Sequence, residues 1–192
     1  GKRRKLDIQY RFRLAVQDKD FILAVYNICK KLGIDVYLKD VTIHNNKYFA
    51  IHSYKQKSLL QLIKISKNRE NNIYWHQGFL AGIFDAEGSW SNSNKKSALR
   101  ITNTNLEIIN QISESLEKLG FKFVIENKKP TIYTVKNCFA IRLLGNLSQK
   151  LRFFSIIKSK IERKKNNIFN MNYIQTDNAQ IQEIKKIGIR DV

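Results

Sequence analysis

Cysteine is scarce in this 192-residue sequence: Cys29 and Cys138 are the only two, and neither belongs to a CxxC pair. This scarcity argues against a disulfide framework and against a structural zinc site, and it fits a reducing intracellular compartment. No apolar run approaches 18 residues, so we expect no transmembrane span. The opening stretch GKRRKLDIQY has no apolar core and is not a secretory signal. We expect an intracellular protein, and an organelle, a bacterial cytoplasm and an archaeal cytoplasm are all compatible with the sequence.

Acidic residues are also few: 16 Asp and Glu stand against 35 Lys and Arg, which gives a formal net charge of +19. A basic chain of this kind is suited to a polyanionic partner, and nucleic acid is the commonest one. Ribosomal proteins and proteins that bind membrane surfaces share this balance, so charge alone does not choose between them. Because 43% of the residues are hydrophobic and 11% are aromatic, the chain can bury a core and is not a disordered basic tail.

The sequence contains an internal repeat. Residues 12–34 align without a gap with residues 99–121, at an offset of 87 residues. The string FAI at residues 49–51 returns at residues 139–141, where the offset has grown to 90. The pairs that share a chemical type include Arg13 with Arg100, Asp20 with Glu107, Ile22 with Ile109, and Gly33 with Gly120. We interpret these matches as two copies of one unit of nearly 90 residues.

Each copy predicts the same order of elements. Alternating basic and apolar residues at 10–14 indicate a strand with one basic face. An amphipathic helix follows, with Asp18 or its equivalent Asn105 as N-cap and Gly33 or Gly120 at its end. The side chains expected to be buried on these two helices are Phe21, Val25, Ile28 and Leu32, then Ile108, Ile112, Leu116 and Leu119. Further strands are expected near 36–43, 47–52, 121–126 and 138–144, and closing helices near 56–65 and 147–157. Cys29 is expected to be a small core residue.

The stretch HQGFLAGIFDAEGSW, residues 76–90, predicts an unusual helix. Each glycine inside a helix costs about 1 kcal/mol relative to alanine. Gly78, Gly82 and Ala86 are spaced by four residues, so they form a ridge of small residues that lets a second helix approach closely. Glu87 would then lie beside the equivalent acid of that helix, and two such carboxylates repel unless a divalent cation lies between them. Paired acids with a metal and a polyanionic substrate suggest metal-assisted phosphodiester cleavage.

The string LAGIFDAEG at residues 80–88 resembles the motif that names the LAGLIDADG homing endonucleases, with Ile83, Phe84 and Glu87 as the departures. The resemblance implies an α+β fold of two pseudo-symmetric α-β-β-α-β-β-α repeats, whose antiparallel sheets form a DNA-binding saddle. It implies a pseudo-dimeric single chain that cuts both strands of a long double-stranded DNA target with Mg²⁺, for which Mn²⁺ can substitute. Glu87 is then the metal-binding catalytic acid, and Asp85 is structural. Gly78, Gly82, Asp85, Ala86 and Gly88 belong to the helix interface.

The repeat divides the chain into an N-terminal repeat at 1–72, a C-terminal repeat at 73–170 and a tail at 171–192. Subtracting the offset from Gly88 gives Gly1, so the first motif helix is not found in the sequence. A fragment of a longer protein would explain this. The other explanation is a natural protein that binds DNA without cutting it.

Further site residues follow from the same resemblance. The basic stretch at 157–169 suggests Lys164 as the residue beside the scissile phosphates, where it would stabilise charge or polarise water. Arg69 is its less secure counterpart in the first copy. The side chains expected to point from strands toward DNA are Arg11, Arg13, His52, Arg100, Lys122 and Arg142. Each is more often a phosphate contact than a reader of bases.

Other functions remain open from the sequence. His44, His52 and His76 lack metal-ligand spacing, so a histidine-dependent nuclease has little support. The main alternative is a non-catalytic nucleic-acid binder, or a maturase that assists the splicing of intron RNA. A ribosome-associated structural protein ranks lower.

Overall fold

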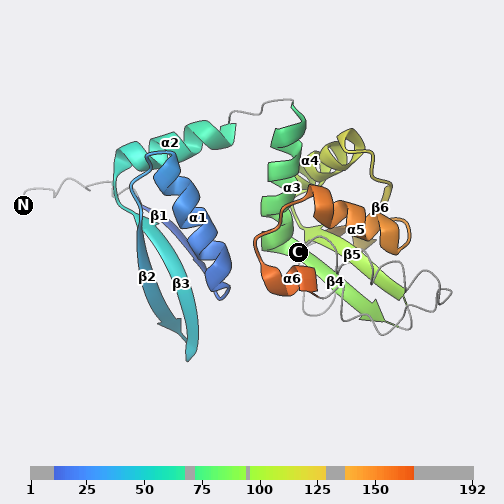
Figure 1. Ribbon diagram of the computed structural model, residues 1–192, viewed down its shortest axis with the longest axis horizontal. Helices are drawn as coiled ribbons and strands as arrows, with labels where there is room; N and C mark the ends of the chain where they lie inside the picture. The colour runs from blue at the N-terminus through green and yellow to red at the C-terminus, as the bar shows by residue number, and fades with distance from the viewer. Residues whose placement is uncertain (1–10, 68–71, 94–95, 129–136, 167–192) are drawn as a thin grey trace, which may run out of the picture.

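Two α+β units lie side by side in a computed structural model, which describes residues 11–67, 72–93, 96–128 and 137–166 (Figure 1). The N-terminal unit contains β1 (Phe12–Val16), α1 (Lys19–Lys31), β2 (Tyr37–Ile43), β3 (Asn46–Ser53) and α2 (Gln56–Lys67). The C-terminal unit contains α3 (Ile73–Glu87), β4 (Gly88–Ser93), β5 (Lys96–Asn103), α4 (Leu106–Lys118), β6 (Phe123–Lys128), β7 (Cys138–Leu143), α5 (Leu147–Ile156) and α6 (Glu162–Asn166). The predicted tail at 171–192 lies outside the described residues.

Both sheets are antiparallel, and their registers repeat each other. The first has the order β1-β3-β2, and the second has the order β4-β5-β7-β6. Arg13 pairs with His52 in the first sheet, as Arg100 pairs with Arg142 in the second. These pairs are related by the offsets of 87 and 90 residues, so the structure confirms the internal repeat. β4 has no counterpart in the first sheet among the described residues. Its place after the motif helix agrees with the α-β-β-α-β-β-α plan, although no residue pattern marked β4 or α6.

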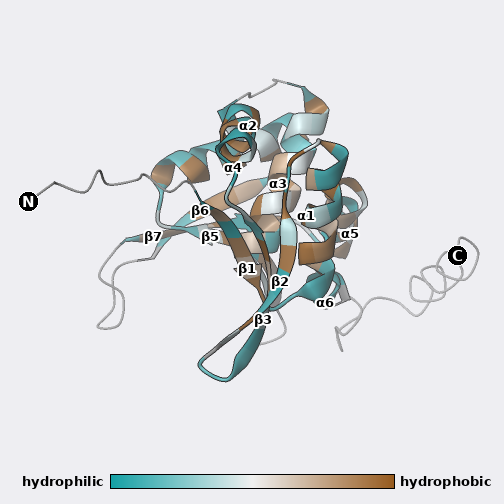
Figure 2. Cartoon of the chain, turned by 90° about the vertical axis from the view of Figure 1, so that its left-hand side faces the viewer, coloured by the Kyte–Doolittle hydropathy of each residue, from teal (hydrophilic) through white to brown (hydrophobic). Residues whose placement is uncertain are grey.

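The helices of each unit cover one face of its sheet. In the C-terminal unit, α3, α4 and α5 bury a core in which the ring of Phe153 meets those of Phe84 and Phe121 edge to face. In the N-terminal unit, Ile22 and Cys29 of α1 are buried against Ile51 of β3. Burial of Cys29 confirms its expected place in the core. In Figure 2 the tip of the β2–β3 hairpin is hydrophilic, in contrast to the hydrophobic strand segments beneath the helices.

The predicted burial of α1 is wrong at two positions. Ile28 is 49% exposed and Leu32 is 47% exposed, and Leu32 is the C-cap residue of the helix. Their equivalents on α4 include Leu119, which is only 7% exposed. Ile28 lines a groove between α1 and α3 instead of packing in the core of its own unit. The apolar stripe of α1 is therefore wider than the surface of its own sheet can cover.

Left-handed backbone ends both amphipathic helices and closes one hairpin. Gly33 and Gly120 have φ of 67° and 69°, and each follows the C-cap residue of its helix, as predicted. His44 and Asn45 have φ of 47° and 63° and form the two-residue loop between β2 and β3. Two consecutive positive φ values are typical of the type I′ turn that matches the twist of a hairpin. His44 is thus a turn residue.

Within the described residues, no helix is both long enough and apolar enough to cross a membrane.

Candidate active site and nucleic-acid interface

The predicted motif helix is α3. Its first turn is capped by Asn72, whose side chain accepts a hydrogen bond of 2.8 Å from the backbone N–H of Trp75. Leu80 and Phe84 are fully buried and attach the helix to the core. At its end, a Cβ on Gly88 would collide with the ring and the carbonyl oxygen of Phe84. The third glycine of the motif is therefore required by close packing at the helix terminus.

The ridge of small residues faces an open groove. A Cβ added to Gly78 or to Gly82 would meet no atom within 4 Å. Both glycines line a groove of about 430 Å³, and side chains of α1 line its opposite wall. The wall residues from α1 are Phe21, Ala24, Val25 and Ile28. The second helix predicted on this ridge is not found among the described residues.

Alanine at Gly82 is expected to stabilise the 192-residue chain by up to about 1 kcal/mol, because alanine favours the helix and its Cβ has open space. Urea unfolding of the variant measures this gain. As a control, alanine at Gly88 is expected to destabilise the chain through the collision with Phe84. A loss of stability in Gly82→Ala would show that another helix, such as one from a second copy, already packs on the ridge.

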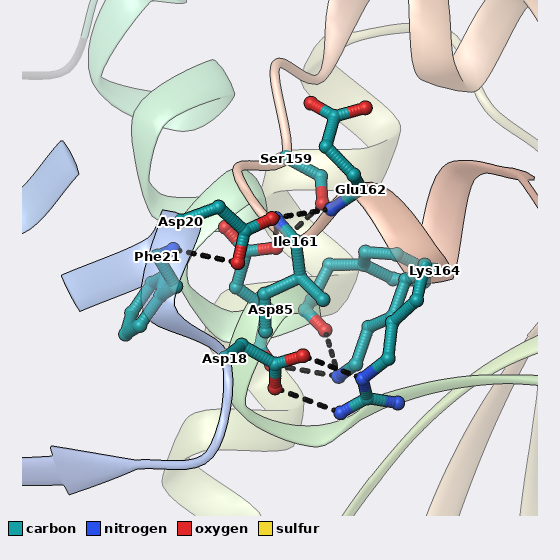
Figure 3. A network of polar contacts seen from close by, with 10 residues as sticks. Asp18, Asp20, Phe21, Asp85, Ser159, Ile161, Glu162 and Lys164 are labelled. Atoms are coloured by element: carbon teal, nitrogen blue, oxygen red, sulfur yellow. Dashed lines mark hydrogen bonds and ion pairs between the residues drawn. The ribbon is translucent and has the colours of Figure 1, made fainter. Parts of the chain in front are cut away.

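The first motif acid, Asp85, is 4% exposed and bonded to the segment between α5 and α6 (Figure 3). Its carboxylate accepts hydrogen bonds from the Ser159 hydroxyl at 2.5 Å, from the Lys160 N–H at 2.8 Å and from the Ile161 N–H at 3.2 Å. A buried carboxylate needs such donors, since each unmet hydrogen bond costs stability. The contacts of Asp85 thus fasten this segment to the end of the motif helix.

Lys164 reaches the C-terminus of α3 from the short helix α6. Its Nζ donates hydrogen bonds to the carbonyl oxygens of Phe84, at 3.0 Å, and Asp85, at 2.6 Å. The last carbonyls of a helix lack partners inside the helix and carry partial negative charge, so an ammonium group is favoured there. Two of its three N–H donors are used in these bonds.

The charge state of Lys164 is set by burial and by its neighbours. Burial lowers its pKa, and the adjacent positive charge of Arg163 lowers it further. The carboxylates of Asp85, Asp18 and Glu87 act in the opposite direction. Glu87 ends the helix whose last carbonyls bind Lys164, so the two residues proposed from the sequence as catalytic lie at the same end of α3.

Glu87 is the last residue of α3, and its side chain is exposed. No group of three or more His, Cys, Asp or Glu side chains that could hold a metal ion occurs within residues 11–67, 72–93, 96–128 and 137–166. Mg²⁺, however, is commonly held by one or two carboxylates together with water and substrate phosphates. A solvent-facing carboxylate at a helix terminus fits that manner of binding.

Residues of the N-terminal unit reach α6 across the boundary between units. Asp18 is the N-cap residue of α1, but its side chain makes no capping hydrogen bond. It binds Arg163 instead, through contacts of 2.6 Å to Nε and 2.9 Å to Nη2. Asn105, its equivalent, does cap its helix by accepting from the Glu107 N–H at 2.9 Å. Both residues thus occupy the predicted N-cap positions, but only Asn105 makes a side-chain capping hydrogen bond, because the carboxylate of Asp18 is engaged by a charged partner.

Arg100 and Arg142 of the second sheet lie on the face opposite the helices, since their neighbours Ile101 and Ile141 are buried in the core. Both bind Glu126 of β6, with Nε–oxygen distances of 3.1 Å for Arg100 and 2.5 Å for Arg142. The hydrogen bond from Arg142, and after it the one from Arg100, hold the pKa of Glu126 below its usual range. Glu126 could not be identified from the sequence, because nothing in its local sequence shows that two arginines bind it.

The equivalent face of the first sheet has no such acid among its described residues. Register places Lys39 beside Ala50 where Glu126 lies beside Ala140. His52 is 2% exposed, and its ring packs in a cluster with those of Tyr37 and Tyr54, with ring centroids 5.7–6.2 Å apart. Neither ring nitrogen of His52 has a hydrogen-bond partner in the described part of the chain.

Positive charge surrounds His52. Burial lowers the pKa of His52, and the charges of Arg11, Arg13 and Lys39 lower it further. The guanidinium of Arg11 also lies 5.5 Å from the centre of the Tyr54 ring, within range of a cation–π contact. The two sheets thus present different surfaces: cations with aromatic rings on the first, and arginines neutralised by an acid on the second.

Three remaining predictions have different outcomes. Lys122 is exposed but is not a strand residue, because β6 begins at Phe123 after the turn at Gly120. Its carbonyl still accepts from the Leu144 N–H at 2.8 Å, so it lies at the end of the sheet. Arg69 lies outside the described residues. His76 is buried, and its Nδ1 is 2.9 Å from the hydroxyl of Ser115.

Comparison with known proteins identifies the fold. Residues 75–158 match the LAGLIDADG-like domain family. An uncharacterised protein of Methanocaldococcus jannaschii is 31% identical over 180 residues, which cover 86% of this chain and 64% of that protein. The chain thus spans under two thirds of that relative's length.

Solved structures show the same arrangement. The homing endonuclease I-DmoI in complex with DNA and Mn aligns with a TM-score of 0.57 at 18% identity, over 78% of this chain and 81% of that one. The N-terminal LAGLIDADG domain of WhiA aligns with a TM-score of 0.54 at 18% identity, over 80% and 73%. Residues 75–158 therefore carry a LAGLIDADG-like domain, and the C-terminal unit follows the α-β-β-α-β-β-α plan of the LAGLIDADG fold. The described N-terminal unit has the β-α-β-β-α part of the same plan.

Proposed function

We propose that this chain, which carries a LAGLIDADG-like domain, is the DNA-recognising and metal-binding part of a site-specific endonuclease of the homing type. Its substrate is a long duplex target, and the reaction is hydrolysis of one phosphodiester bond in each strand. The observation that carries this proposal is that Glu87 and Lys164 are both located at the C-terminal end of α3: Glu87 is its last residue, and Lys164 binds the carbonyls of Phe84 and Asp85. The two sheets of the same chain carry basic residues.

The chain's own residues supply three functions in this proposal. Glu87 holds the divalent cation, Mg²⁺ or Mn²⁺, and that ion supplies charge neutralisation at the scissile phosphate. Lys164 stabilises negative charge on the phosphate or polarises a water molecule, from a position held by the carbonyls of α3. Asp85 keeps the segment that precedes Lys164 attached to the same helix end.

The sheets supply recognition. Two-stranded and larger β ribbons fit the DNA major groove, where arginine pairs with guanine through two hydrogen bonds. On the second sheet, Glu126 holds Arg100 and Arg142 in fixed positions, which favours reading bases over loose contact with phosphates. The cation-rich face with Arg11 and Arg13 favours phosphate contacts.

The second candidate is a nucleic-acid binder without nuclease activity, on DNA or on intron RNA. One observation favours it: the described residues contain a single motif acid proposed to bind metal, Glu87, whereas a centre built on two motif helices needs a second. Selection of bound sequences from a random duplex library, followed by incubation with Mg²⁺ or Mn²⁺, separates the two candidates. Cut products support the endonuclease, and tight binding with intact strands in every metal supports the binder.

Salt dependence of binding tests the basic surface. With +19 net charge, the affinity for the selected duplex is expected to fall steeply with salt, with a slope of about −0.9 per phosphate neutralised. Six contacts would give a slope of about −5 in a plot of log affinity against log salt. Glu126→Gln is expected to raise affinity for all sequences, because it removes a negative charge. Arg142→Ala is expected to lower affinity for the selected duplex and to relax the preference at a few base pairs. A slope near −1, measured by fluorescence anisotropy, would contradict binding across both sheets.

A further inference from the structure

Lys164 belongs to α6, a helix that is too short to be stable without contacts from other segments. α6 has five residues, Glu162–Asn166, and isolated helices of this length are unstable in water. The placement of its lysine must therefore come from contacts made by neighbouring segments. One such contact is Asp85, which comes from the same unit and binds residues 159–161.

The other contacts come from the N-terminal unit (Figure 3). Asp20 accepts a hydrogen bond of 2.9 Å from the Glu162 N–H, the first of α6. Asp18 binds the guanidinium of Arg163 through two parallel contacts, the geometry in which arginine is held most specifically. These two acids are more than 140 residues from their partners in sequence, with separations of 142 and 145. They fix both the start of α6 and the residue next to Lys164.

The repeat within the chain shows that Asp18 is not occupied in supporting its own helix. Its equivalent, Asn105, caps α4 by accepting from the Glu107 N–H. Asp18 occupies the same N-cap position on α1 and makes no such bond. Its carboxylate is 14% exposed and is directed to Arg163.

Asp18 and Arg163 also act on the pKa of Lys164. The hydrogen bond from Arg163 lowers the pKa of Asp18, so the carboxylate stays ionised beside α6. The positive charge of Arg163 disfavours the ammonium form of Lys164, and the negative charge of Asp18 favours it. Removal of the Asp18 charge would take away one of the negative charges that oppose the effect of Arg163 on the lysine.

We infer that Asp18 and Asp20 of the N-terminal unit are positioning residues for Lys164, so that contact between the two units is needed to assemble the cleavage centre. This inference rests on the proposed endonuclease function for its kinetic consequence. Neither acid is required to touch the substrate: each acts through α6.

The test compares Asp18→Asn with a control, Asp40→Asn, which removes an exposed ion pair with Lys47 on the distant β2–β3 hairpin. In a chain that cleaves DNA, Asp18→Asn is expected to lower kcat by on the order of 10-fold with little change in KM, since small misplacements near the reacting group reduce rate more than binding. The pH–rate profile should contain one limb that reports the titration of Lys164, identified by its absence in Lys164→Met. In Asp18→Asn this limb is expected to move to lower pH, because the Asp18 charge raises the pKa of Lys164. Asp40→Asn is expected to leave kcat and the pH–rate profile unchanged.

A charge reversal separates positioning from general stability. The double variant Asp18→Arg with Arg163→Asp restores an ion pair of opposite polarity, so it is expected to recover most of kcat. Each single change breaks the ion pair and is expected to keep kcat low. Equal kcat and an unmoved pH profile in Asp18→Asn would overturn the inference. So would a loss of kcat that the double variant does not recover while its thermal unfolding remains that of the parent.

A titration of Lys164 by NMR of its ε-carbon decides the point without cleavage. The ammonium group is expected to lose its proton at a lower pH in Asp18→Asn than in the parent chain, and at an unchanged pH in Asp40→Asn. If the parent chain cuts no DNA in any metal, the proposed function fails, and this titration alone supports or overturns the effect of Asp18 on Lys164. An unchanged titration would overturn it.

Discussion

Glu87→Gln is expected to abolish double-strand cleavage while leaving the fold and the affinity for duplex DNA intact. Glutamine keeps the size of the side chain but removes the negative charge that a divalent cation requires. We expect the rate to fall by at least about 10³-fold, equivalent to about 4 kcal/mol of lost transition-state stabilisation. Because Glu87 is exposed at the helix end, the loss of its charge leaves no buried group unsatisfied.

The measurement is single-turnover cleavage in Mg²⁺, made on the 192-residue chain and on a form with a first motif helix added ahead of Gly1. Binding is measured separately in Ca²⁺, whose looser coordination suits capture without reaction. Glu114→Gln, an equally exposed change on α4, is the matched control and is expected to cut at the parent rate. Cleavage by Glu87→Gln at the parent rate would remove the metal-binding role from this residue.

Asp85→Ala is expected to have the opposite phenotype, a loss of folding stability of about 3 kcal/mol or more. The change removes the acceptor for one hydroxyl and two backbone N–H groups, from Ser159, Lys160 and Ile161. Each donor left unsatisfied in a buried site costs about 1–3 kcal/mol. Urea unfolding, followed by circular dichroism, measures the difference in the free energy of unfolding.

Asp85→Asn and Asp40→Ala are the controls for this loss. Asparagine keeps one acceptor oxygen, so it is expected to cost less than alanine. Asp40 is an exposed residue, and its removal is expected to change stability by less than about 1 kcal/mol. If Asp85→Ala unfolds at the same urea concentration as the parent, its three hydrogen bonds do not hold the segment before α6. The two motif acids, two residues apart in sequence, are thus expected to fail in different assays.

Much of the fold followed from patterns that are local or repeated. The gapless match of residues 12–34 with 99–121 predicted equivalent strands and helices, and the paired registers of Arg13 with His52 and Arg100 with Arg142 agree with it. The motif helix was predicted from small and apolar residues at helical spacing, and α3 ends at the motif acid Glu87. Such features are readable because backbone periodicity repeats over a few residues.

The tertiary structure alone decided which polar groups meet. Nothing near Asp18 in the sequence distinguishes a helix cap from a partner of Arg163, and local reasoning chose the cap. The capture of Arg100 and Arg142 by Glu126 likewise depends on strand order, which brings β6 beside β7.

The exposure of Ile28 was also beyond local reasoning, because it depends on a groove shared by two helices that are distant in the chain. A local pattern shows which face of a helix or strand is apolar, and for both units the sequence alone determined these apolar faces. Which neighbour covers that face, or which charge reaches across to another unit, depends on contacts between residues as far apart as 145 positions, and only the folded chain sets those distances.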